Sequence, residues 1–189
     1  MQDTTERQEH LSLLFQQRHL KILGCSGKVV DLMNLRPEDV NIEDIAWSLS
    51  QQCRFNGHTK FFYSVAEHSV LVAKRVETES PVIRLQALLH DAAEAYLGDI
   101  IQPVKVLFPA IGILEEHIQK VIFAKYGVPL KMDPRVIEAD QALLQDEIQE
   151  LILNRTGHHG LFNHELNRSN TAGFLEAFRY LTSACHRHS

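Results

Sequence analysis

The chain has 189 residues, of which 44% are hydrophobic, and a formal net charge of −5 at pH 7. Length and composition predict one compact domain over residues 1–189, because no linker rich in proline, glycine or serine divides the chain. The acidic balance disfavours a broad nucleic-acid-binding surface, although a small anionic substrate needs only a local group of positive charges. Three cysteines without a C-x-x-C pair support neither a disulfide framework nor a cysteine zinc site.

The sequence shows no signal peptide and no apolar run of the length that a transmembrane helix needs. We therefore expect a cytoplasmic protein, with no partner in the membrane.

The pattern of caps and apolar residues predicts an all-α protein, a helical bundle. The run KVVDLMNL is predicted to be an irregular strand with no lasting partner, and GHHGLFNHELNR a loop whose histidines, like His186 and His188, are solvated. The expected helices cover, in chain order, about residues 5–22, 42–53, a segment that begins after Ser64, 81–97, 109–126, 134–154 and 171–184.

His68 is predicted to face the core from the third of these helices. Ser64 and Glu67 have the spacing of a capping box, which begins the helix there. Val65 and Val72 lie three and four positions from His68, so the imidazole shares the apolar face.

The pair His90-Asp91 lies in the apolar run LQALLHDAAEAYLGD, which we expect to be one continuous helix from Pro81 to Gly98. Asp140 is predicted to lie in an apolar seam of the helix that Asp133 and Pro134 begin. Burial of a lone carboxylate there costs several kcal/mol, roughly, unless a cation or partner compensates it.

Each of these residues, taken alone, is more often a satisfied polar group of the core than a ligand. Together, two histidines and two aspartates on inward positions are hard to satisfy by ordinary core hydrogen bonds. Such a mixed nitrogen and oxygen set suits a divalent cation, Mn²⁺, Fe²⁺, Co²⁺, Zn²⁺ or Mg²⁺. The sequence therefore predicts a metal site formed by His68, His90, Asp91 and Asp140.

The pattern His68, His90-Asp91, Asp140 resembles the HD-domain metal phosphohydrolases, which are all-helical proteins with those four ligands. The segments RFNGHTKFFYSVAEHSVLVA and LLHDAAEAYLGDIIQPVK narrow the resemblance to the small nucleotide-hydrolysing branch, over about residues 24–153. Within that branch, Gly57-His58-Thr59 after the arginine is more similar to the phage dATP triphosphohydrolases. The bacterial 5'-deoxynucleotidases usually have a tryptophan where this chain has Phe55.

Phosphate hydrolysis also needs a proton donor and fixed positive charges. Glu94, one helical turn from His90, is the candidate general acid or water-orienting residue, and an exposed helix carboxylate is its alternative. The resemblance implies that Arg54 and Lys105 contact phosphate oxygens.

The remaining candidates surround the expected substrate. Asp99 is expected to accept a hydrogen bond from a sugar hydroxyl or to bind a second metal, with an N-cap role equally open. An apolar wall would favour a 2'-deoxyribose, because a 2'-hydroxyl would be left unsatisfied. The expected wall residues are Phe55, Ile100, Ile101 and Pro103.

The resemblance thus implies a dATP triphosphohydrolase that attacks the α-phosphorus, releases deoxyadenosine and triphosphate, and also acts on dADP and dAMP. Two other classes stay open: another HD enzyme, either a 5'-deoxynucleotidase acting on dNMPs or a guanosine-alarmone hydrolase, and a non-catalytic module in which a metal staples the bundle. The expected partners are the substrate and further copies of the chain, because relatives in this branch form dimers or hexamers.

Overall fold

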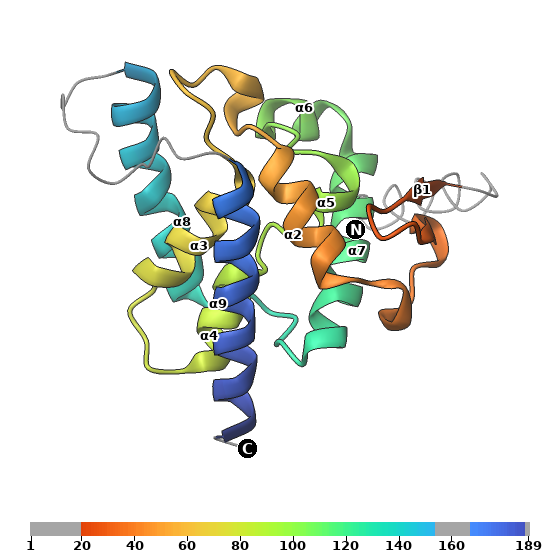
Figure 1. Cartoon of the computed structure of the whole chain (residues 1–189). Coiled ribbons are helices and arrows are strands. Elements are labelled where there is room, and N and C mark those ends of the chain that lie inside the picture. The colour runs from red at the N-terminus through yellow and green to blue at the C-terminus, as the bar shows by residue number, and fades with distance from the viewer. Residues whose placement is uncertain (1–19, 154–166, 188–189) are drawn as a thin grey trace, which may run out of the picture.

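The computed structural model describes residues 20–153 and 167–187. These residues are mostly helical, as predicted, with one short hairpin at the edge of the molecule (Figure 1). The helix predicted from Thr5 lies almost entirely outside the described residues. Its predicted end at Ile22 is wrong, because Lys21–Leu23 form strand β1.

The hairpin joins β1 to β2 (Val29–Asp31) in antiparallel register, with Ile22 opposite Val30. The prediction that the run KVVDLMNL has no lasting partner is therefore wrong. Short 3-10 turns follow at Leu32–Asn34 and Pro37–Asp39. Asp44 ties the hairpin tip to the helix behind it, because its carboxylate accepts hydrogen bonds from the backbone N–H and the hydroxyl of Ser26, both at 2.7 Å.

Side-chain caps begin three of the described α-helices, two of them at the predicted residues Ser64 and Asp133. Asn41, Ser64 and Asp133 each accept a backbone N–H of the first turn, and Gly127 adopts the left-handed conformation that ends a helix. The α-helices are α2 (Ile42–Gln51), α3 (Val65–Arg75), α4 (Pro81–Leu88), α5 (Glu94–Leu97), α6 (Gln102–Leu107), α7 (Pro109–Tyr126), α8 (Pro134–Glu147) and α9 (Asn167–Arg187).

Four further segments differ from the prediction. The expected helix over 81–97 is divided into α4 and α5 by a turn at residues 89–93, so His90 and Asp91 do not lie on an α-helix. The expected helix over 134–154 changes to a π-helix at Ile148–Leu153. The predicted loop GHHGLFNHELNR lies largely outside the described residues, and its last two residues belong to α9. Helix α6 was not predicted.

Helix α9 packs against α2, α3 and α4, and it runs along one face of the molecule in Figure 1. Its Phe174 is fully buried, together with Tyr63, Leu88 and Ile118 from other segments. Helix α8 packs against α3 and so brings Asp140 towards His68. None of the described helices is long and apolar enough to cross a membrane.

Candidate metal centre

His68 is fully buried on α3, with its two ring nitrogens facing different partners. Nδ1 lies 2.6 Å from a carboxylate oxygen of Glu147 on α8. Nε2 lies 3.1 Å from Oδ1 of Asp140 and 3.3 Å from Nε2 of His90. The inward position predicted for His68 is confirmed.

The turn at residues 89–93 carries the other two predicted ligands. Its backbone hydrogen bonds run to the third residue back, from Ala92 N–H to Leu89 and from Glu94 N–H to Asp91, so the chain is wound more tightly than an α-helix. Adjacent residues of an α-helix do not face each other. In this turn, by contrast, Nε2 of His90 lies 3.2 Å from Oδ2 of Asp91.

The two imidazoles have defined tautomers. Nδ1 of His90 lies 2.8 Å from the backbone carbonyl of Ala87, so it must carry the proton and donate it. By the same argument, Nδ1 of His68 donates to Glu147 when both rings are neutral. Both Nε2 atoms then present lone pairs to each other.

As long as both rings are neutral, those facing lone pairs and the Asp140 carboxylate form a set of acceptors without a donor. One ligand atom from each of His68, His90 and Asp140 lies within 4.8 Å of the other two, which is compatible with a shared metal ion. Asp91 approaches the same point, with Oδ2 at 3.6 Å from Nε2 of His68. The donor types therefore fit a divalent cation, with Asp91 as the predicted fourth ligand.

The charges around the site change the proton affinities of its members. Burial alone would lower the pKa of His90, but the charge of Asp91 and its hydrogen bond raise it to about 9. Burial would raise the pKa of Asp91, but His90, His68 and Arg54 hold it far below its usual range. Without a metal, His90 is therefore protonated, and its positive charge balances the carboxylates of Asp91 and Asp140.

Glu147 is a member of the site that the sequence analysis missed. It is fully buried at the end of α8 and binds three side chains with its two oxygens. Oε1 accepts from Tyr63 at 2.7 Å and from His68 at 2.6 Å, and Oε2 accepts from Arg54 at 3.1 Å. The signal available was its spacing of seven from Asp140, which places both on one face of a helix.

Arg54 reaches the centre from a turn with unusual backbone geometry. Phe55 and Asn56 have φ of 56° and 52°, in the left-handed region that L-residues rarely adopt. The segment is anchored where the Arg54 N–H donates to the Tyr63 carbonyl at 2.9 Å. The Arg54 side chain is 12% exposed, and its Nη1 lies 3.6 Å from Asp91.

Glu94 follows the turn as the first residue of α5 and is 5% exposed. Lys105 lies 3.4 Å from its Oε1 and 2.7 Å from Glu115, another residue that the sequence analysis missed. Burial, and next the charges of Asp91 and Asp99, raise the pKa of Glu94 to about 10. Glu94 is therefore protonated at neutral pH in the metal-free protein, which a proton donor requires, whereas its exposed alternative is wrong.

Asp99 is half-buried, and its interactions with Arg54, Asp91 and Lys105 place it at the edge of the same group of charges. Burial raises its pKa. Its sugar-binding and metal-binding roles stay predictions, but the N-cap alternative is wrong, because the next helix, α6, has Ile101 at its N-cap.

The predicted wall residues include Phe55, which lies under Arg54 with the guanidinium carbon 5.4 Å from its ring centroid. Pro103 is exposed on α6, and Ile100 and Ile101 are half-buried in the segment before it. A cavity of about 270 Å³ opens beside His90, lined among others by Glu115, Phe123 and Met132 rather than by the predicted wall. The wall stays a prediction.

Comparison with known proteins gives relatives of similar length. No family model matches the chain. The chain is 44% identical over 129 residues to the uncharacterized protein YfdR of Escherichia coli strain K12, an alignment that covers 68% of this chain and 71% of YfdR. It is 40% identical over 127 residues to the uncharacterized protein RCAP_rcc00048 of Rhodobacter capsulatus, covering 62% of this chain and 63% of that protein.

Proposed function

We propose that this chain, which belongs to the family of the uncharacterized Escherichia coli protein YfdR, is an HD-type metal-dependent phosphohydrolase of 2'-deoxynucleoside 5'-phosphates. The observation that carries the proposal is the convergence of the Nε2 atoms of His68 and His90, 3.3 Å apart, on the carboxylate of Asp140. A purely structural core would pair acceptors with donors. Neutral imidazoles whose acceptors face one another instead favour a bound cation.

A divalent cation at these ligands would lower the pKa of water and neutralise phosphoryl oxygens. The surrounding residues divide the remaining tasks. Glu94 is buried beside the ligands, and burial raises the pKa of its carboxyl group, so it can hold a proton for the leaving 5'-oxygen; Lys105 lies 3.4 Å from the same carboxyl group. Arg54 can offer guanidinium N–H groups to a phosphate, because its buried Nε has no hydrogen-bond partner among the described residues.

A metal staple without activity is the less favoured alternative. A structural metal site needs neither a second buried carboxyl group beside the ligands nor an arginine held next to them. Both features accompany the site, in Glu94 and Arg54.

Two candidate substrates, dATP and the dNMPs, differ in the number of phosphate groups that the site must bind. The sequence resemblance favours dATP, with attack at the α-phosphorus and release of triphosphate. The salt bridges of the two basic side chains at the site favour the second candidate, a 5'-deoxynucleotidase acting on dNMPs. Arg54 is already bound to Glu147 and Lys105 to Glu115, which leaves less positive charge for a triphosphate than the sequence alone suggested.

The test is a hydrolysis assay with dATP, dAMP and ATP, with and without added Co²⁺ or Mn²⁺, followed by anion-exchange chromatography or ³¹P NMR of the products. Triphosphate and deoxyadenosine from dATP support the first candidate. Hydrolysis of dAMP alone supports the second. Orthophosphate or pyrophosphate as the first product from dATP would contradict the release of intact triphosphate. Slower hydrolysis of ATP is expected, because its 2'-hydroxyl would be buried without a partner at a cost of about 1–3 kcal/mol.

Lys105→Gln separates these candidates further. If Lys105 contacts the distal phosphates, the substitution raises KM for dATP and leaves KM for dAMP unchanged. Metal binding without hydrolysis of any of these nucleotides would favour the non-catalytic module.

A further inference from the structure

We propose that Glu147 is a positioning residue that couples anion binding at Arg54 to metal binding at His68. The inference rests on the proposed metal site and goes beyond it, because Glu147 is not one of the expected ligands. One carboxylate serves both sides: Oε1 binds Nδ1 of His68 at 2.6 Å, and Oε2 binds Nη2 of Arg54 at 3.1 Å.

The contact with His68 fixes where its lone pair points. An imidazole that donates from Nδ1 has its free lone pair on Nε2, and a carboxylate acceptor also makes the ring a stronger ligand. Glu147 is fully buried and cannot turn to solvent. It therefore holds Nε2 of His68 towards His90 and Asp140 and prevents the ring from adopting the other tautomer.

The contact with Arg54 fixes the guanidinium beside the same centre. Arg54 also approaches Asp91, with Nη1 at 3.6 Å from Oδ2, so it lies between a predicted metal ligand and Glu147. The left-handed turn at Phe55 and Asn56 holds the backbone after Arg54 in a costly conformation. Such a conformation persists when side-chain contacts such as the one with Glu147 stabilise it.

Local structure keeps Glu147 in place from both sides. Tyr63 donates to Oε1 at 2.7 Å, and the backbone of Tyr63 and Arg54 is paired across the same loop. A π-helix begins directly after Glu147, and its Leu151 carbonyl accepts from the Lys60 N–H at 3.1 Å. The loop that carries Arg54 and the helix end that carries Glu147 are therefore joined at more than one point.

Glu147→Gln tests the coupling. A glutamine has one acceptor oxygen, so it can bind either the His68 side or the Arg54 side, and its amide N–H₂ opposes the donor on the other side. We expect Co²⁺ affinity to fall by about 10–100-fold and the visible absorption of bound Co²⁺ to change. We also expect the affinity of the Co²⁺-loaded protein for inorganic phosphate to fall, measured by isothermal titration calorimetry without any turnover.

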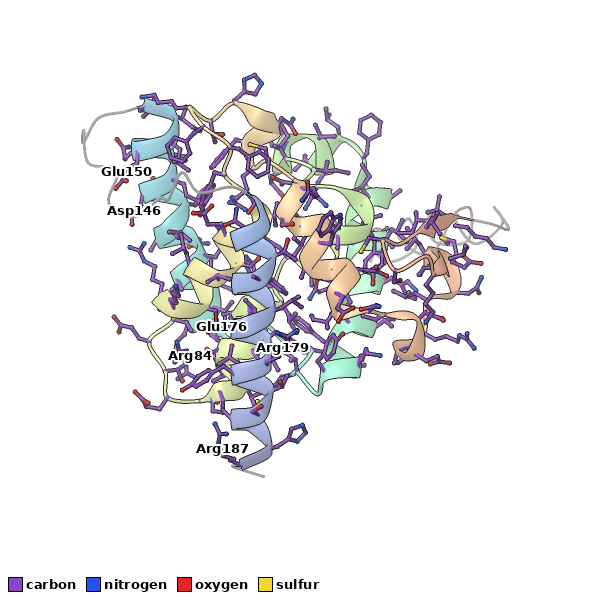
Figure 2. The ribbon with its side chains drawn as sticks, viewed as in Figure 1. Arg84, Asp146, Glu150, Glu176, Arg179 and Arg187 are labelled. Carbon is purple, nitrogen blue, oxygen red and sulfur yellow. The ribbon has the colours of Figure 1, made fainter. Side chains whose placement is uncertain are left out.

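Asp146→Asn is the matched control. It makes the same change of charge one residue earlier on α8, where the carboxylate pairs with Arg75 and lies at the outer edge of the molecule (Figure 2). Its Co²⁺ and phosphate affinities are expected to stay within about twofold of the wild type, as is usual for exposed ion pairs.

The outcomes separate the coupling from the proposed function. A wild-type protein that binds no Co²⁺ overturns the metal site itself. Wild-type binding with an unchanged affinity and spectrum in Glu147→Gln overturns the positioning role alone, as does an equal loss in Asp146→Asn. If circular dichroism shows that Glu147→Gln does not fold, Glu147→Asp, which keeps the charge, carries the test. We expect it to lose less affinity than Glu147→Ala, and an equal loss contradicts the coupling.

Discussion

His68 and His90 face each other through their Nε2 atoms, 3.3 Å apart, while their Nδ1 atoms bind a carboxylate and a backbone carbonyl. Two neutral imidazoles in this arrangement repel through their lone pairs. A proton or a metal ion between the rings removes the repulsion. The same arrangement can therefore bind a metal ion or, when no metal is bound, a proton.

The first prediction is that His68→Ala and Asp91→Asn each abolish stoichiometric metal binding and hydrolysis together. Each substitution removes one of only four predicted donors, and the remaining atoms cannot complete the coordination shell. Elemental analysis of the purified variants measures the metal content. His186→Ala, at an exposed position of α9, serves as the control and is expected to keep full occupancy. Full occupancy with retained hydrolysis in Asp91→Asn would remove Asp91 from the site.

The inward position of His68 and the helix that carries Asp140 could be predicted, because local sequence patterns determine both. The phase of the helix after Ser64 placed His68 inward, and the cap formed by Asp133 and Pro134 fixed the helix that carries Asp140. Both inferences need only the periodicity of one helix and its first turn.

The division of the helix at residues 89–93 could not be predicted in the same way. The apolar pattern continues through this segment, so the sequence reads as one helix. The break depends on contacts from outside the pattern: the His90 ring binds the Ala87 carbonyl, and Gln119 of α7 bridges Leu89 and Ala93. Glu147 was missed for a related reason, because its three partners lie 79 to 93 residues earlier in the chain.

The second prediction separates chemistry from binding. Glu94→Gln is expected to lower kcat by roughly 10²-fold while metal content and KM change little. Glutamine is nearly isosteric with the protonated carboxyl group that the structure favours, so the local packing should persist, but it cannot release a proton. Steady-state kinetics with elemental analysis measures both effects. Glu116→Gln, which changes an exposed residue of α7 that pairs with Lys120, is the control and is expected to keep kcat. Loss of metal in Glu94→Gln would show that Glu94 is a ligand instead.

The third prediction concerns the stability of the metal-free protein, which is expected to fall as the pH rises from about 6.5 to 8.5. The folded-state pKa values of His90 and Glu94, about 9 and about 10, lie above their usual values of 6.5 and 4.5. The folded state therefore holds more protons than the unfolded state in this range, and stability decreases by at most about 1.4 kcal/mol per pH unit for each group. Asp91, with a lowered pKa, contributes stability that is lost only in acid.

Thermal unfolding at several pH values in the presence of a chelator measures this slope. Added Co²⁺ should flatten it, because the cation takes the place of the proton on His90. Glu94→Gln should also reduce the slope, since a glutamine does not titrate. A metal-free protein that becomes more stable from pH 6.5 to 8.5 contradicts the prediction.

The last prediction concerns Gln119, which holds the turn that carries His90 and Asp91. Its Nε2 donates to the Leu89 carbonyl at 2.7 Å, and its Oε1 accepts from the Ala93 N–H at 3.0 Å. Gln119→Leu removes both hydrogen bonds and leaves two backbone groups without partners, at a cost of about 2–4 kcal/mol in the free energy of unfolding.

The same substitution should weaken metal binding although both hydrogen bonds of the Gln119 side chain go to backbone groups, because a looser turn no longer holds His90 and Asp91 close together. Urea unfolding of the metal-free protein and a Co²⁺ titration measure the two effects separately. Gln145→Leu makes the same chemical change at an exposed position of α8 and is expected to change neither. Equal losses in the two variants would show that added apolar surface, rather than the lost bridge between Leu89 and Ala93, is responsible. A loss of stability with unchanged Co²⁺ affinity would show that the tight turn keeps its shape without Gln119, so that the His90 ring and its bond to the Ala87 carbonyl are sufficient to maintain it.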